Sequence, residues 1–205
     1  MLDFLRGTYR RALTPAARLL AAAGVSPVLV TVVGTVGVVV GSLTLFPAGH
    51  FLAGSLTVAF FLLGDGLDGT LARLTGQESR FGAFLDSTLD RLADAAVFAG
   101  ISLWAAGGRP IVLGLSLACL AFGFLVSYAR ARAEAMGVDA SVGLFERTDR
   151  LVGALVGVLA VGLGAPVWAL TLALAIVALG SAITVGQRVH AAWKGLRPMG
   201  RLNER

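Results

Sequence analysis

Four aspartates in the first half of the chain are spaced so that they could act together. Asp65 and Asp68 are three residues apart, and Asp86 and Asp90 are four apart, so each pair lies on one face of a helix. No histidine or cysteine lies near them in the sequence. All-oxygen ligation of this kind suits Mg²⁺, Mn²⁺ or Ca²⁺. The spacing therefore predicts a site where two helices bind divalent cations.

The same carboxylates have two other interpretations on the residues alone. Ion pairs with Arg73, Arg80 and Arg91 would account for one or two of the aspartates, but not for four in register. A transporter of divalent cations or protons would also need such groups, because ionisable residues inside membrane spans commonly mark ion paths. Both alternatives stay open at this point.

The elements that must position these residues are long apolar segments. The chain has 205 residues, of which 57% are hydrophobic and only 14% are charged. Four stretches contain no charged residue: 19–64, 95–108, 110–129 and 151–187. Because about 20 apolar residues span the hydrocarbon core, the pattern predicts an integral membrane protein and excludes a disordered chain. The net charge of +5 is assigned to membrane topology and not to nucleic acid.

We predict an all-α fold with six transmembrane helices. Breaks at 46–50 and 162–166 divide the two longest apolar stretches. The expected helices lie near 26–46, from 51 onward, at 82–107, at 110–132 and on both sides of the second break. Every basic residue except Arg109 then falls on one side of the membrane, together with both termini. The positive-inside rule makes that side cytoplasmic, so the plasma membrane is the expected location.

A single membrane domain is expected to occupy the whole chain, 1–205. Within 1–24, apolar residues recur at helical spacing with arginines on another face, which predicts an amphipathic helix at the membrane surface. The six-helix core is assigned to 25–190, and 191–205 form a basic cytoplasmic tail.

Residues 65–90 together form one long motif. The chain reads Asp65-Gly-Leu-Asp68-Gly69-Thr-Leu-Ala72-Arg73, then eight residues, then Gly82-Ala-Phe-Leu-Asp86-Ser-Thr-Leu-Asp90. This segment resembles the signature of the CDP-alcohol phosphotransferases, DxxDGxxAR(x8)GxxxDxxxD, at every fixed position. The resemblance implies a homodimeric enzyme that transfers a substituted phosphate from a CDP-activated donor to an alcohol and releases CMP.

The resemblance also implies roles for individual residues. Two divalent ions, Mg²⁺ with Mn²⁺ as an alternative, would be bound by Asp65, Asp68, Asp86 and Asp90, and Asp90 would also be the general base. The CDP-diacylglycerol site would comprise Val28, Leu29, Val30, Thr31, Asp68, Gly69, Ala72, Arg73 and Ser79. Many relatives have Asn where this chain has Val28, so no Asn side-chain contact to the nucleotide is expected.

A second region indicates the alcohol. Residues 127–137 and 145–150, together with Gln187 and Arg188, resemble the actinobacterial branch of this family that joins CDP-diacylglycerol to inositol phosphate, giving phosphatidylinositol phosphate. This resemblance implies that arginines bind the acceptor phosphate through paired donors. The expected residues are Arg130, Arg150 and Arg188, with Arg132 and Arg147 as weaker candidates.

Two other interpretations apply to this region. Positive-inside topology alone would also place arginines here, and relatives commonly have Lys at the position of Arg130. A basic pocket fits glycerol 3-phosphate as well as inositol phosphate, so a phosphatidylglycerophosphate synthase is the nearest alternative.

Overall fold

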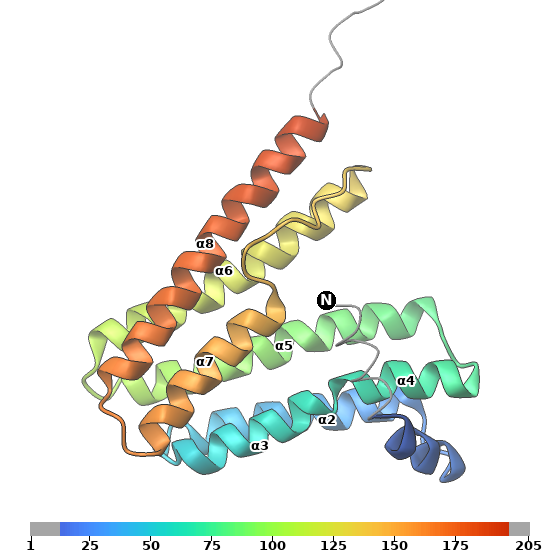
Figure 1. Ribbon diagram of the computed structural model, residues 1–205, viewed down its shortest axis with the longest axis horizontal. Coiled ribbons are helices and arrows are strands. Elements are labelled where there is room, and N and C mark those ends of the chain that lie inside the picture. The colour runs from blue at the N-terminus through green and yellow to red at the C-terminus, as the bar shows by residue number, and fades with distance from the viewer. Residues whose placement is uncertain (1–12, 197–205) are drawn as a thin grey trace, which may run out of the picture. The chain divides into compact units, whose positions relative to one another are not determined.

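The computed structural model describes residues 13–196, except for the side chain of Asp65, and this part of the chain contains helices and no strand (Figure 1). The labelled helices are α2 (Pro27–Leu45), α3 (Phe51–Leu63), α4 (Asp65–Thr75), α5 (Arg80–Ala105), α6 (Pro110–Ala135), α7 (Arg147–Gly162) and α8 (Trp168–Leu196). The all-α prediction is confirmed. The chain forms two compact units, which divide between Trp104 and Ala105 and are described separately.

Four helical stretches in the described residues are long and apolar enough to cross a membrane. They are Pro27–Leu45, Phe51–Thr75, Pro110–Ala135 and Trp168–Leu196. The other two expected spans correspond to α5, which carries the charged motif residues, and to α7, which has only 16 residues. Length and composition thus support a membrane protein, and the number of six crossings stays a prediction.

The helix breaks lie where the sequence places them. Ser26 caps α2 by accepting a hydrogen bond from the N–H of Leu29 (3.2 Å), and Pro27 occupies the first turn, where its missing N–H costs nothing. The predicted break at 46–50 contains Gly49 at φ +78°, and Gly164 in the second break has φ +100°. These positive φ angles favour glycine and end the preceding helices.

One element differs from the expectation. The helix predicted from 51 is interrupted at Gly64, so Asp65 and Asp68 belong to a new helix, α4. The N–H of Gly64 bonds to the carbonyls of both Phe60 and Phe61, and its own carbonyl accepts from Leu67 in a tighter, three-residue turn. Glycines on both sides of Asp65 lower the helix propensity at this point. The first acidic pair therefore opens a helix, where the macrodipole favours negative charge.

The core of the first unit relies on close contact between helices. The glycine at position 37 of α2 faces the ring of Phe61, and Gly54 of α3 faces the ring of Phe46, which is fully buried. A side chain at Gly100 of α5 would collide with the backbone carbonyl of Ser42. Small residues of this kind let membrane helices approach closely.

The second unit is built on α8, which packs against both α6 and α7 (Figure 1). Leu170 and Leu174 of α8 are fully buried, as are Ala154 and Val158 of α7. The loop 136–146 joins α6 to α7 and contacts the C-terminal half of α8. The loop connects α6, which carries Arg130 and Arg132, to α7, which carries Arg150.

The two ends of the predicted domain are covered only in part. Residues 13–22 are helical, and Ala17 is buried whereas Leu19 is exposed. The rest of the predicted amphipathic helix, 1–12, and most of the basic tail, 197–205, lie outside the described residues. The surface helix therefore remains a prediction.

Candidate active site

A cavity of about 280 Å³ lies within the first unit, among the beginning of α2, the helix α4 and the beginning of α5. Most of the predicted donor and metal residues line it. They are Val28, Thr31, Asp68, Gly69, Ala72, Arg73, Ser79 and Asp86. The start of α2 and the motif residues of α4 are thus brought to one cavity, although Thr31 and Asp68 are 37 positions apart in the sequence.

Asp68 is a buried acidic side chain of this cavity whose two carboxylate oxygens both accept hydrogen bonds. It is only 8% exposed, and the hydroxyl of Thr31 donates a hydrogen bond of 2.6 Å to its Oδ2. The N–H of Gly69 bonds to Oδ1. Both carboxylate oxygens are therefore held by neighbours from α2 and α4, which fixes the orientation of the group.

Of the second acidic pair, which lies on α5, only Asp86 lines the cavity. Asp86 lines the cavity, whereas Asp90, one turn further along α5, has a side chain that is 16% exposed and forms an ion pair of 3.3 Å with Arg91. The side chain of Asp65 lies outside the described residues. Among the side chains that the structure describes, no three His, Cys, Asp or Glu residues form a group placed to hold a metal ion. The joint ligation by four aspartates stays a prediction.

Three further residues of the predicted donor site line the cavity: Gly69, Arg73 and Ser79. Arg73 is exposed in the last turn of α4 and places a guanidinium group at the cavity wall. Gly69 has no side chain to separate the helix backbone from a ligand, and its nearest neighbour is the guanidinium of Arg73. Ser79 has a structural function in addition, because its Oγ accepts a hydrogen bond of 2.9 Å from the N–H of Gly82 at the start of α5.

Two of the predicted donor residues do not reach this cavity. Leu29 and Val30 line a second, apolar cavity of about 530 Å³, together with residues of α3 such as Phe60 and Phe61. Helical periodicity explains the difference, because Val28 and Thr31 are three residues apart and share a face that Leu29 and Val30 do not. The prediction took 28–31 together from the family resemblance and did not separate the faces of the expected helix.

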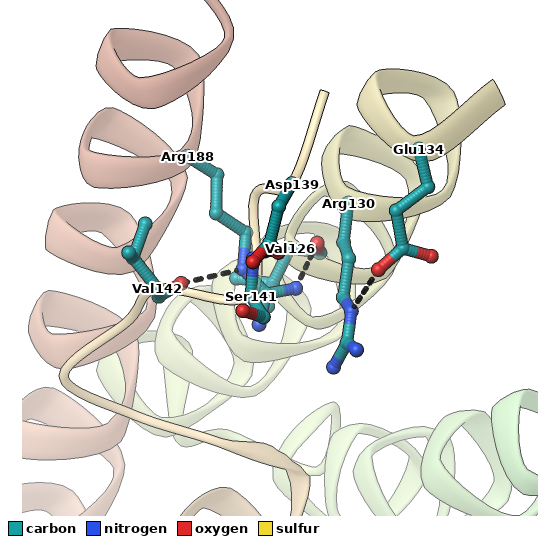
Figure 2. Close-up of polar contacts among 7 residues, drawn as sticks. All are labelled: Val126, Arg130, Glu134, Asp139, Ser141, Val142 and Arg188. Carbon is teal, nitrogen blue, oxygen red and sulfur yellow. Dashed lines mark hydrogen bonds and ion pairs between the residues drawn. The ribbon is translucent and has the colours of Figure 1, made fainter. Parts of the chain in front are cut away.

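Two of the predicted acceptor arginines are buried in the second unit. Arg188 is 5% exposed; its Nε donates to the carbonyl of Val142 (2.9 Å) and its Nη1 to that of Val126 (2.6 Å; Figure 2). Arg150 is 1% exposed, and its guanidinium group lies beside Gly123 of α6. The two cations act electrostatically on each other. Burying like charges is costly, so this arrangement is well suited to an anionic ligand.

The two candidate acceptor arginines on α6, Arg130 and Arg132, are exposed. Arg130 forms an ion pair with Glu134 through its Nε (2.7 Å), and its two terminal nitrogens point away from that carboxylate (Figure 2). The nearby Asp139 also acts on Arg130, and hydrogen bonds from Ser141 hold the pKa of Asp139 below its ordinary value. Arg132 is exposed as well. Arg130 thus keeps a two-nitrogen edge directed away from its partner.

The sequence reasoning missed Thr184. Its hydroxyl accepts a hydrogen bond of 2.9 Å from the N–H of Phe145 in the loop 136–146, and it is fully buried. The sequence could have indicated it through the spacing of Thr184, Gln187 and Arg188, three polar residues on one face of a mostly apolar helix.

Comparison with known proteins agrees with the motif. The model of the CDP-alcohol phosphatidyltransferase family matches residues 24–187. The chain is 46% identical to the phosphatidylinositol phosphate synthase of Streptomyces avermitilis, over 91% of this chain and 80% of the relative. It is 44% identical to that of Mycolicibacterium smegmatis, over 91% of this chain and 86% of the relative.

Solved structures agree as well. The crystal structure of Mycobacterium tuberculosis phosphatidylinositol phosphate synthase with CDP-DAG bound has a TM-score of 0.85 and 41% identity, over 92% of this chain and 98% of that one. A second structure of that protein, in complex with manganese and citrate, also has a TM-score of 0.85 and 41% identity, over 91% and 93%. The chain belongs to the CDP-alcohol phosphatidyltransferase family.

Proposed function

We propose that this protein transfers the phosphatidyl group of CDP-diacylglycerol to inositol phosphate, giving phosphatidylinositol phosphate and CMP. One observation carries the proposal: a single cavity holds Asp68, Asp86 and Arg73 beside the N-terminus of α2. This combination suits a nucleotide diphosphate, and relatives that are 46% and 44% identical to this chain are phosphatidylinositol phosphate synthases.

The donor is bound in the cavity of the first unit. The guanidinium of Arg73 pairs with phosphate oxygens, and the positive N-terminal end of the α2 dipole adds to the positive potential of the cavity. Gly69 and Ala72 are small, so the nucleotide can approach the backbone of α4. Val28 and Thr31 of α2 also line this cavity, whereas Leu29 and Val30 line the apolar cavity.

Divalent cations fit the donor set of this cavity. Asp68 and Asp86 direct carboxylates to it, and the residues that line it include no His or Cys. We assign Asp65, Asp68, Asp86 and Asp90 as ligands of two Mg²⁺ ions, which Mn²⁺ can replace. When bound, such ions neutralise the diphosphate and stabilise the leaving phosphate oxygen. The bond from Thr31 holds Asp68 in one orientation, as partners of metal ligands commonly do.

Asp90 accepts the proton in the reaction. The acceptor hydroxyl oxygen attacks the phosphorus that bears the diacylglycerol, and its proton passes to the carboxylate of Asp90. The bond from that phosphorus to the bridging oxygen breaks, and CMP leaves with the electron pair. Arg91 holds the Asp90 carboxylate through their ion pair.

The acceptor phosphate is bound by arginines of the second unit. Arg150 and Arg188 provide buried positive charge, and Arg130 provides a two-nitrogen edge, with Arg132 as an exposed contributor. Arginine matches phosphate oxygens in pairs, which favours a phosphorylated alcohol over a neutral one.

We also propose how the protein is placed in the cell. Six helices, α2, α3 with α4, α5, α6, α7 and α8, cross the plasma membrane, with both termini on the cytoplasmic side. The excess of arginines at one end of these helices supports this orientation. The protein functions as a homodimer, as the motif resemblance implies.

An acceptor assay tests the proposal. Purified protein receives CDP-diacylglycerol and Mg²⁺ with either inositol phosphate or glycerol 3-phosphate, and both CMP and the lipid product are measured. We expect phosphatidylinositol phosphate from the first acceptor and little product from the second. Product from glycerol 3-phosphate alone would show a phosphatidylglycerophosphate synthase. Absence of CMP release, with cation flux in sealed vesicles, would show a transporter.

A further inference from the structure

Three polar side chains lie in succession on one face of α8 and all bond to the backbone of the loop 136–146. Thr184, Gln187 and Arg188 are three and then one residue apart, which places them on adjacent turns of the same face. The bonds run from the N–H of Phe145 to Thr184 Oγ1 (2.9 Å), from the N–H of Leu144 to Gln187 Oε1 (2.9 Å) and from Arg188 Nε to the carbonyl of Val142 (2.9 Å).

The loop lies directly on the helix over most of its length. Val138 packs where a side chain at Gly195 would stand, and the ring of Phe145 packs where one at Gly180 would stand. Between them, a side chain at Gly143 would collide with Thr184. The loop therefore runs antiparallel to α8, and the glycines remove the side chains that would separate the two.

Thr184 is the central residue of this contact. Its side chain is fully buried, and its one hydroxyl makes two bonds: it accepts from Phe145 and donates to the carbonyl of Gly180 (2.8 Å). Gln187 is exposed, so its bond to Leu144 depends less on packing. The two side chains thus hold neighbouring loop amides by different means.

The loop leads without interruption into the helix that carries Arg150. Glu146, the residue after Phe145, forms a reciprocal capping box with Asp149, and α7 begins at Arg147. Bonds that fix residues 144 and 145 on α8 therefore also fix where α7 begins. Because Arg150 is in the first turn of α7, its position depends on these bonds.

We propose that Thr184 and Gln187 are positioning residues for the phosphorylated acceptor: they hold the loop 136–146 on α8 so that Arg150 stays in register with Arg188. This inference rests on the proposed function, which assigns the acceptor phosphate to these two arginines. Neither Thr184 nor Gln187 touches the acceptor; each acts through the loop.

The test compares variants that lack the side-chain oxygen of Thr184 or of Gln187 with variants that keep an oxygen at that position. Thr184→Val and Gln187→Leu remove a bond to the loop, whereas Thr184→Ser and Gln187→Glu retain an oxygen there. Thr171→Val is the matched control, because Thr171 lies on the same helix and its hydroxyl bonds to the carbonyl of Val167, the residue before that helix, and not to the loop 136–146 (3.2 Å).

We expect the KM for inositol phosphate to rise about three- to tenfold in Thr184→Val and in Gln187→Leu, the change that one lost hydrogen bond produces. The KM for CDP-diacylglycerol should stay at the wild-type value. In Thr184→Ser and Gln187→Glu, the KM for inositol phosphate should return to near the wild-type value. In Thr171→Val it should equal the wild-type value. Hydrogen exchange should show faster exchange of the amides of Leu144 and Phe145 in the first two variants.

Three outcomes would overturn the proposal. They are a wild-type acceptor KM in both variants, an equal rise of donor and acceptor KM, and faster loop exchange without any change of acceptor KM. If Thr184→Val does not fold, Gln187→Leu decides, because its site is exposed. If the wild-type protein uses only glycerol 3-phosphate, the proposed function has failed, and the KM comparison is made with that acceptor.

Discussion

The hydroxyl of Thr31 donates a hydrogen bond of 2.6 Å to Asp68, and this bond joins α2 to α4 across 37 positions of the sequence. Asp68 is 8% exposed, so its carboxylate is withdrawn from bulk water and depends on such partners. Thr31 therefore holds a proposed metal ligand in place before any ligand arrives.

Thr31→Val should weaken the use of divalent cations. The substitution keeps the branched shape and removes the donor to Asp68, so we expect the Mg²⁺ concentration for half-maximal CMP release to rise about tenfold. Thr31→Ser should behave like the wild type. Thr35→Val is the control, since buried Thr35 donates to the carbonyl of Thr31 and not to Asp68. An unchanged Mg²⁺ dependence in Thr31→Val would remove Thr31 from the site.

Asp90→Asn should abolish turnover but retain donor binding. An amide cannot take the proton from the acceptor hydroxyl, so we expect CMP release to fall at least about a hundredfold. Arg91→Ala removes the ion-pair partner and leaves the carboxylate, so its loss should be much smaller. Comparable losses in the two variants would instead favour the ion-pair interpretation of Asp90.

Removal of divalent cations should stop the reaction and change the stability of the protein. Chelation with EDTA should end CMP release, and Mg²⁺ or Mn²⁺ should restore it. Because a ligand that binds only the folded state stabilises it, Mg²⁺ should also raise the melting temperature. That increase should be lost in Asp68→Asn. Synthesis that continues after complete chelation would refute the metal assignment.

Arg150→Lys should raise the KM for the acceptor with little effect on the KM for the donor. Lysine keeps the charge but loses the paired donors that match phosphate, and the site is 1% exposed, so water cannot replace them. Arg132→Lys is the matched control, because Arg132 is exposed on α6. Equal effects of the two substitutions would indicate that general positive charge, and not a pocket, attracts the acceptor.

The sequence was sufficient for the features that depend on composition and local spacing. Apolar runs and their breaks predicted where α2, α6 and α8 lie, because hydrophobic length and turn residues are local properties. The motif from Asp65 to Asp90 predicted the family, since its spacing is fixed by two helices and the turn between them.

The features that it did not predict depend on the rotation of helices and on contacts distant in sequence. In a uniformly apolar helix, hydropathy does not show which face meets a cavity, so Leu29 and Val30 were grouped with Thr31. The break at Gly64 depends on a few competing hydrogen bonds, and the contact of Thr184 is with a loop residue 39 positions earlier in the sequence.

Gly100→Ala should destabilise the protein although alanine is the better helix former. A methyl group at this position would collide with the backbone carbonyl of Ser42, which cannot turn aside as a side chain can, so α2 and α5 must separate. Overpacking of this kind costs about 1–3 kcal/mol, more than the roughly 1 kcal/mol that alanine gains over glycine in a helix. Gly114→Ala is the matched control: its site on α6 has open space, so the same substitution should raise the melting temperature in detergent. Because the collision occurs away from the cavity residues, Gly100→Ala should lower the melting temperature more than it changes either KM. A melting temperature above that of the wild type would show that these two helices are not in close contact.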